Sequence, residues 1–307
     1  TGAAGCLGSH VSERLVNMGH DVIGIDCFTD YYARHLKEMN VADIKKAGVR
    51  FIQADLATTP LLPILQGVDV IYHLAGQPGI SAHVTLAAYT RNNLLATHKL
   101  LEAAKQTPSL KLFVNTATSS CYGHHATDEE NVAAQPVSYY GVTKLAAEQL
   151  ALAYQRTGDL PACSLRLFSV FGPRERPEKL YPRLIGALLT DGEIPLYEES
   201  LEHLRSFTYV HDALDGFVAA LNNIDKMPGE IFNIGSDKQM STKEAIEMVE
   251  SLIGKKTRFK HMPKRPGDQK VTHANIDKAR RVLGYEPKTA HIDGFATQIE
   301  WYKKRIL

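Results

Sequence analysis

Two spacings of apolar residues alternate along the first half of the chain. Apolar residues from Leu7 to Met18 recur at the spacing of one helix face, and Gly19 follows them as a helix C-cap. Short segments rich in apolar residues then predict buried strands, at residues 22–25, 49–55, 69–75, 112–117 and 162–168. Because buried runs alternate with helical segments, the pattern predicts an α/β fold built on a doubly wound parallel sheet, the Rossmann arrangement.

Two longer helices are predicted between the last three of these strands. One helix of about twenty residues passes through Asn93, and a second carries Tyr140 and Lys144 and runs to about Arg156. Helices of this length can cover one face of a sheet along its whole depth.

Beyond Phe168 the alternation breaks down. Prolines, glycines and charged residues between positions 172 and 202 predict loops and short helices over a cleft. Further elements are predicted in this part: strands at 207–210 and 231–234 and an amphipathic helix at 242–253. We therefore expect residues 1–168 to form a nucleotide-binding domain, to which residues 207–235 return, and residues 169–307 to form mainly a smaller substrate-binding lobe.

Three glycines open the chain at the spacing of a dinucleotide-binding loop. Gly2, Gly5 and Gly8 allow a tight turn, close approach of a pyrophosphate and close helix packing, with the phosphate at a helix N-terminus. A loop of this kind normally follows a strand. That first strand is absent from the printed sequence, so we expect the natural protein to have several more N-terminal residues. Asp26 ends the next strand, where a carboxylate binds the adenosine ribose and repels a 2′-phosphate, which favours NAD over NADP.

Tyr140 and Lys144 form a Tyr-x-x-x-Lys pair downstream of this loop. Residues four apart lie on one face of a helix, so the ammonium can sit beside the phenol. A phenol has a pKa near 10, and a neighbouring cation favours the phenolate. Together with Thr118, the pair can therefore take a proton from an alcohol while a hydride leaves the same carbon.

The composition of the chain limits the kinds of binding partner that we expect. Lys+Arg 35 against Asp+Glu 34 leaves a net charge of +1, which does not favour nucleic acid or an anionic membrane as a partner. No apolar run reaches the roughly 18 residues of a membrane helix. The cysteines lack Cys-x-x-Cys spacing and the histidines lack His-x-x-x-His spacing, so we expect reduced thiols, a cytoplasmic protein and no metal site.

The chain resembles the extended short-chain dehydrogenase/reductase family, which includes nucleotide-sugar epimerases and dehydratases. The residues that carry the resemblance are 1–8, Asp55, 73–76, Asn93, 118–123, Tyr140, Lys144, 166–174, 233–235 and 265–268. The resemblance implies a tightly held NAD, a homodimer formed through the two long helices, and Thr118, Tyr140 and Lys144 as the catalytic set. It also implies that Asp55 contacts adenine and that Leu74, Ala75 and Asn93 belong to the cofactor site.

The pair after Thr118 discriminates between reactions in this family. In the 4,6-dehydratases the pair is Asp-Glu, and the UDP-glucuronate decarboxylases have Glu in the second place. Here the residues are Ser119 and Ser120, neither of which titrates near neutral pH. Elimination therefore lacks its acid and base, and epimerisation by reversible oxidation remains.

The substrate site most resembles that of the UDP-glucuronate 4-epimerases. The resemblance implies that Ser119, Ser120 and Ser169 hold the carboxylate of the sugar. It places further residues at the UDP-sugar site: Arg183, Arg205, Arg265 and Asp268. The family's Gly-Asp-Gly stretch before Arg205 is missing, and Gly76 stands where alanine is usual. We therefore expect the loop over the substrate to differ.

The sequence thus predicts an NAD-dependent 4-epimerase acting on a UDP-sugar, with UDP-glucuronate as the leading substrate. UDP-glucose or UDP-N-acetylhexosamine epimerisation and UDP-glucuronate decarboxylation are the nearest alternatives. A non-catalytic NAD-sensing protein is disfavoured, because Thr118, Tyr140 and Lys144 are all present. In the expected cycle, Lys144 and the positive nicotinamide lower the pKa of Tyr140.

Overall fold

The computed structural model describes residues 1–81, 83–264 and 269–307. Parallel strands form its centre: β1 (Ile23–Asp26), β2 (Arg50–Gln53), β3 (Val70–His73), β4 (Leu112–Thr118), β6 (Ala162–Leu167) and β11 (Ile231–Ile234). The strand order is β11-β6-β4-β3, with β1 and β2 paired beside them. Every residue of β4 and β6 is buried, as expected for strands covered on both faces.

The first residues of the chain connect the two groups of strands. The backbone nitrogen of Thr1 donates to the carbonyl of Tyr72 in β3 at 2.8 Å, and that of Ala3 donates to the carbonyl of Ile25 in β1 at 3.1 Å. The glycine-rich loop therefore lies between β1 and β3, at their carboxyl ends.

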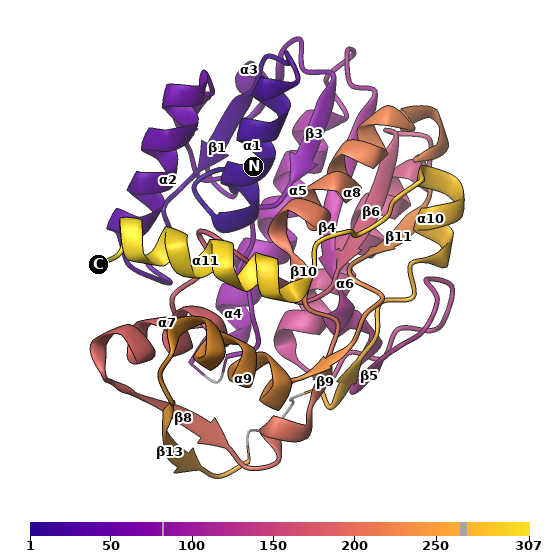
Figure 1. Ribbon diagram of the computed structural model, residues 1–307. Helices are drawn as coiled ribbons and strands as arrows, with labels where there is room; N and C mark the ends of the chain where they lie inside the picture. The colour runs from indigo at the N-terminus through magenta and orange to yellow at the C-terminus, as the bar shows by residue number, and fades with distance from the viewer. Residues whose placement is uncertain (82, 265–268) are drawn as a thin grey trace.

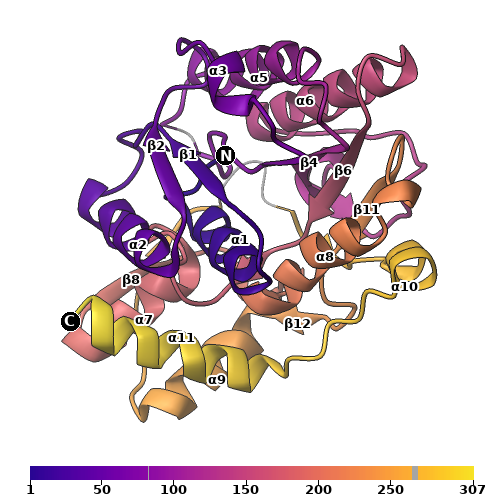
Figure 2. The same cartoon turned by 90° about the horizontal axis from the view of Figure 1, so that it is seen from above.

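Helices cover both faces of the sheet (Figure 2). One layer contains α3 (Leu62–Leu65), α5 (Ala96–Ala104) and α6 (Tyr139–Arg156), and the other contains α1 (Cys6–Asn17), α2 (Arg34–Ala47) and α8 (Val210–Asn222). The predicted doubly wound parallel sheet is confirmed.

A smaller lobe lies at the lower end of the molecule in Figure 1. Its main elements are α7 (Leu180–Thr190), α9 (Thr242–Ile253) and the parallel pair β8 (Glu193–Tyr197) and β13 (Arg258–Met262). Two further small sheets are formed by short strands, in the orders β12-β9-β14-β5 and β10-β7: β5 (His125–Ala126), β7 (Val170–Phe171), β9 (Leu204–Arg205), β10 (Thr208–Tyr209), β12 (Met240–Ser241) and β14 (Val271–Thr272). The chain ends with α10 (Asp277–Leu283) and α11 (His291–Arg305). The domain boundary at Phe168 remains a prediction.

Two predicted elements differ from the structure. The strand predicted at 207–210 is only β10, because Val210 already begins α8. The apolar residues at this point serve the helix, since Val210, Ala213, Leu214 and Phe217 recur at helical spacing and are all buried. The helix predicted through Asn93 is present as one continuous run, but its middle part is a π-helix, η1 (Thr90–Leu95), between α4 (Leu86–Tyr89) and α5.

Candidate active site

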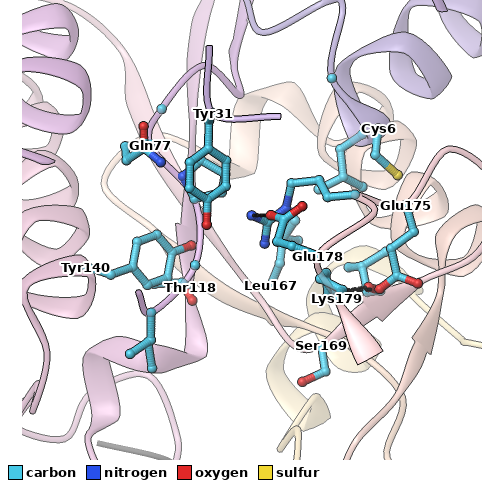
Figure 3. A pocket seen from close by; sticks show the side chains of 18 of the residues that line it. Cys6, Tyr31, Gln77, Thr118, Tyr140, Leu167, Ser169, Glu175, Glu178 and Lys179 are labelled. Carbon is cyan, nitrogen blue, oxygen red and sulfur yellow. Dashed lines mark hydrogen bonds and ion pairs between the residues drawn. The ribbon is translucent and has the colours of Figure 1, made fainter. Parts of the chain in front are cut away.

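A cavity of about 640 Å³ opens where the carboxyl ends of the parallel strands face the smaller lobe. The ends of β1, β3, β4 and β6 contribute its floor, and β8 contributes to the opposite wall. Figure 3 shows Thr118 and Tyr140 on one side of this cavity and Cys6, Glu175 and Lys179 on the other. Open α/β sheets bind their ligands at this edge.

The glycine-rich loop meets the cavity at Gly2, Gly5 and Gly8. Gly2 has φ +71, and a Cβ there would lie 2.7 Å from the backbone nitrogen of Ala75. A Cβ at Gly8 would lie 2.0 Å from the carbonyl oxygen of Gly2. The loop is therefore folded too tightly for side chains at these two positions, and α1 starts directly behind it at Cys6. This is the geometry of a pyrophosphate site at a helix N-terminus.

Asp26 lies at the end of β1 and lines the cavity. One of its carboxylate oxygens accepts a hydrogen bond from the backbone nitrogen of Ala4 at 3.1 Å, and the other accepts one from Phe28 at 2.8 Å. The carboxylate thereby shapes the loop as well as facing the cavity. Asp55 also lines the cavity and forms an ion pair with Arg91 at 2.6 Å.

Leu74 and Ala75 line the cavity beside the glycine-rich loop, but Asn93 does not. Asn93 is only 1 % exposed; its amide oxygen accepts from the backbone nitrogen of Gln77 at 2.6 Å, and its amide nitrogen donates to Thr143 Oγ1 at 3.0 Å. The π-helix places this side chain between the cofactor-facing segment and α6. Asn93 thus supports the wall of the site instead of facing a ligand.

Thr118, Tyr140 and Lys144 are brought together at the start of α6. The side chains of Thr118 and Tyr140 lie on the same side of the cavity (Figure 3). Ser138 caps the helix by accepting a hydrogen bond from the backbone nitrogen of Gly141 at 3.1 Å. A Cβ at Gly141 would lie 2.6 Å from the carbonyl of Ser120, so a glycine here lets α6 approach the end of β4.

Burial raises the pKa of Tyr140, while the nearby hydroxyl of Thr118 and the guanidinium of Arg176 act in the opposite direction. The net shift is upward, so the expectation that Lys144 lowers this pKa is wrong for the protein by itself. The Lys144 ammonium lies near Gly76, where it would be 3.9 Å from a Cβ. Burial also lowers the pKa of Lys144 to about 8, against a smaller raising effect of Glu148.

Ser119, Ser120 and Ser169 all line the cavity. Ser119 and Ser120 begin the 3-10 turn η2 (Ser119–Tyr122) directly after Thr118, and Ser169 follows β6. Within residues 1–81, 83–264 and 269–307, the hydroxyls of these serines form no hydrogen bond with another side chain or with the backbone. Their hydroxyls can therefore donate to a bound ligand.

Arg183 and Arg205 line the lobe side of the cavity. Arg183 is exposed, and Arg205 donates to the carbonyls of Leu204 and Gln269. Arg265 and Asp268 lie outside the described residues. In the described part of the chain, no cluster of His, Cys, Asp and Glu could hold a metal ion, and no helix is long and apolar enough to cross a membrane.

Several residues at the cavity were not found from the sequence. Tyr31, Gln77 and Arg176 line it, and Gln77 is 6 % exposed. Glu175 is nearly buried and forms an ion pair with Lys179 at 2.5 Å. Glu175 and Arg176 directly follow the family motif at 166–174, which could have drawn attention to them. Tyr31 has no comparable signal in the sequence.

A Rossmann sheet whose glycine-rich loop shares one cavity with a Tyr-x-x-x-Lys pair defines a dinucleotide-dependent enzyme of the short-chain dehydrogenase/reductase type. The model of the NAD dependent epimerase/dehydratase family matches residues 1–235, and the chain belongs to this family.

Named relatives and solved structures agree with this assignment. An uncharacterized UDP-glucose epimerase, YtcB of Bacillus subtilis (strain 168), is 36% identical over 306 residues, which cover 98% of this chain and 96% of the relative. UDP-glucuronate 4-epimerase 6 of Arabidopsis thaliana is 34% identical over 324 residues, which cover 98% of this chain and 70% of the relative. The crystal structure of UDP-glucuronic acid 4-epimerase from Bacillus cereus, in complex with UDP-glucuronic acid and NAD, matches with a TM-score of 0.94 and 36% sequence identity. The match covers 99% of this chain and 98% of that chain.

Proposed function

We propose that the protein is an NAD-dependent nucleotide-sugar 4-epimerase that converts UDP-glucuronate to UDP-galacturonate through a 4-keto intermediate. The observation that carries this proposal is the arrangement after β4, where Thr118 shares the cavity wall with Tyr140 (Figure 3) and is followed by Ser119 and Ser120. Elimination of water needs a titratable acid and base beside the sugar. Hydroxyl groups cannot supply them, whereas reversible oxidation at one carbon needs only the base and the hydride acceptor.

The residues of the loop fit a dinucleotide. Gly2 and Gly8 leave no room for a Cβ, so a pyrophosphate can approach the backbone, and Asp26 faces the cavity at the end of β1. NAD bound there supplies a hydride acceptor that later returns the hydride. Since the reaction causes no net oxidation, the cofactor has to stay bound between the two half-reactions.

In the first half-reaction, Tyr140 removes the proton of the 4-hydroxyl while the hydride leaves C4. Thr118 lies on the same side of the cavity as Tyr140 (Figure 3) and can bind the same sugar oxygen, which keeps that oxygen within reach of the base. The keto sugar then turns over in the cavity and receives the hydride on its opposite face. Tyr140 returns the proton to the new 4-oxygen.

A 4-keto glucuronate is a β-keto acid, which loses CO₂ when its carboxylate stands perpendicular to the carbonyl plane. An epimerase therefore has to hold the carboxylate away from that orientation. Ser119, Ser120 and Ser169 present hydroxyls to the cavity that have no other partner among the described residues. Such donors can fix a carboxylate without leaving it desolvated.

The experiment is an NMR time course with UDP-glucuronate, UDP-glucose and UDP-N-acetylglucosamine. We expect UDP-galacturonate from UDP-glucuronate, with little 4-keto-pentose product. UDP-glucose remains the second candidate substrate, because the named function of the relative from Bacillus subtilis is that of a UDP-glucose epimerase. Conversion of UDP-glucose without conversion of UDP-glucuronate would refute the carboxylate assignment.

We further infer that the protein is a homodimer of a reducing compartment such as the cytoplasm. Leu86, Leu95 and Val142 are exposed by 46%, 41% and 46% on the outer faces of α4, η1 and α6, where a second copy could cover them. All cysteines are free thiols. Val142→Glu should convert the dimer to monomers in light-scattering chromatography, and a monomeric wild-type protein would refute the assembly.

A further inference from the structure

Tyr31 reaches the catalytic tyrosine from a distant part of the chain. It lies in the loop that follows Asp26, the last residue of β1, and it lines the same cavity as Tyr140. Figure 3 shows its hydroxyl end pointing toward that of Tyr140. The Tyr31 phenol also contributes, after burial, to raising the pKa of Tyr140, so the two groups lie within electrostatic reach of each other.

The loop that carries Tyr31 is fastened on both sides. The backbone nitrogen of Phe28 donates to the Asp26 carboxylate at 2.8 Å, and Lys37 Nζ donates to the carbonyl of Thr29. Phe28 adopts φ +55, a left-handed conformation that these contacts stabilise. The loop therefore holds Tyr31 over the cavity.

A second contact holds the ring of Tyr31 from across the cavity. The guanidinium carbon of Arg176 lies 5.6 Å from the ring centroid, and Arg176 is itself fixed by an ion pair with Glu178 at 2.5 Å. Arg176 also packs against the loop after β3, where its Nη2 would lie 3.1 Å from a Cβ built at Gly79. Loops that follow β1, β3 and β7 thus meet above Tyr140.

The Tyr31 hydroxyl has no hydrogen-bond partner in the part of the chain that the structure describes. A general base must lie within hydrogen-bond reach of the proton that it removes. The reacting hydroxyl of a sugar therefore has to sit beside Tyr140, and the neighbouring hydroxyls of the same pyranose ring then face the next donors on the wall. Tyr31 is such a donor.

We propose that Tyr31 is a sugar-binding residue, whose hydroxyl hydrogen-bonds a hexose hydroxyl next to the one that Tyr140 deprotonates. Its ring, held by Arg176, closes the cavity over the sugar. This inference rests on the proposed function for the hexose as ligand. It adds a contact from the cofactor-side loop, so that one loop serves both the dinucleotide, through Asp26, and the sugar.

The test compares Tyr31→Phe with Tyr139→Phe. Tyr139 is 58% exposed outside the cavity, so its variant controls for the loss of a phenol hydroxyl elsewhere. Calorimetry should show about a two- to tenfold loss of affinity for UDP-glucuronate in Tyr31→Phe, the value of one neutral hydrogen bond. Affinity for UDP, which lacks the hexose, and the content of bound NAD should not change. Tyr31→Ala should lose more, because the ring is removed as well.

The inference is overturned if Tyr31→Phe and Tyr139→Phe have the same ratio of UDP-glucuronate to UDP affinity. It is also overturned if Tyr31→Phe loses NAD and UDP affinity together, since the role would then be structural. Wild-type protein that binds UDP-glucuronate but turns over no UDP-sugar would refute the proposed function alone, because the affinity ratio still decides the role of Tyr31. Wild-type protein that binds UDP-glucuronate no more tightly than UDP would overturn the contact itself.

Discussion

Glu148 and Arg166 form a buried ion pair one helical turn beyond Lys144. The Nε of Arg166 donates to one carboxylate oxygen at 2.9 Å and its Nη2 donates to the other at 2.6 Å, and the two side chains are 0% and 2% exposed. The pair joins α6 to β6, and therefore joins the helix that carries Tyr140 and Lys144 to the centre of the sheet.

Removal of Glu148 should strongly destabilise the protein. Glu148→Ala leaves the Arg166 guanidinium buried without a counter-ion, so we expect the free energy of unfolding to fall by about 3–5 kcal/mol in urea titrations. Glu38→Ala is the matched control, because Glu38 forms an ion pair of similar length, 2.7 Å, with Arg34 on the exposed surface. The control should change stability by no more than about 0.5 kcal/mol. Equal effects of the two variants would contradict the role assigned to the buried pair.

Tyr140→Phe should abolish most turnover while the protein keeps its fold and its NAD. The variant lacks the hydroxyl that exchanges a proton with the sugar, and a positioned acid/base is worth roughly two to four decades in rate. Epimer formation by NMR and cofactor content by absorbance measure the two outcomes. If turnover stays within a few-fold of wild type, Tyr140 is not the base.

Lys144→Met should stabilise the protein at neutral pH although it impairs catalysis. Burial lowers the pKa of Lys144 from 10.5 to about 8. The unfolded chain therefore binds more protons than the folded protein between these values, so wild-type stability rises with pH from about 8 to 10.5. The variant has no buried ammonium, and its advantage of about 1–3 kcal/mol should be present below pH 8 and vanish by the upper end of this window. A difference that does not depend on pH would show that the ammonium is not the cause.

Denatured protein should release NAD, and Asp26→Ala should narrow the preference for NAD over NADP. The carboxylate of Asp26 faces the cavity at the end of β1, where it repels a 2′-phosphate. Because this carboxylate also accepts hydrogen bonds from Ala4 and Phe28, Asp26→Asn serves as a second variant that keeps an acceptor. Mass spectrometry of the extracted cofactor shows whether it is NAD or NADP. A 2′-phosphate on the cofactor would contradict the predicted preference for NAD.

Ser119→Ala and Ser120→Ala should each weaken the binding of UDP-glucuronate by about 0.5–1.5 kcal/mol. Each should also raise the fraction of product that has lost CO₂, since the carboxylate gains rotational freedom. Ser109→Ala is the control, because its hydroxyl donates to the carbonyl of Val68 outside the cavity. NMR measures the fraction of product that has lost CO₂. If this fraction is unchanged in both serine variants, Ser119 and Ser120 do not hold the carboxylate.

Local patterns predicted most of the nucleotide-binding half. The strands at Leu112–Thr118 and Ala162–Leu167 are buried on both faces, so most of their residues are apolar and the strands can be recognised from the sequence, although Asn115 and Arg166 interrupt the runs. The helix Thr242–Ile253 has the predicted bounds, because Ser241 and Glu244 form a capping box at its start and Gly254 ends it in a left-handed conformation.

The predictions that were wrong concern interactions between segments. A phenol four residues from a lysine suggests a lowered pKa, yet the pKa of Tyr140 depends first on burial by the surrounding loops. The contacts of Asn93 with Gln77 and Thr143 likewise could not be read from the sequence, and its role at the cofactor site stays a prediction. Neither burial nor the direction of a side chain is determined by neighbours along the chain.

The amino-acid sequence alone was enough to indicate the parallel sheet, the glycine-rich loop and the set of Thr118, Tyr140 and Lys144, because spacing and residue type carry that information locally. The presence of Tyr31 and Arg176 at the same cavity as Tyr140 was decided by the tertiary structure. These residues lie on loops after different strands, and parallel topology brings the carboxyl ends of those strands to one edge of the sheet. Contacts of this kind depend on how distant loops pack against one another, and this packing cannot be predicted from the periodicity of residues along the chain.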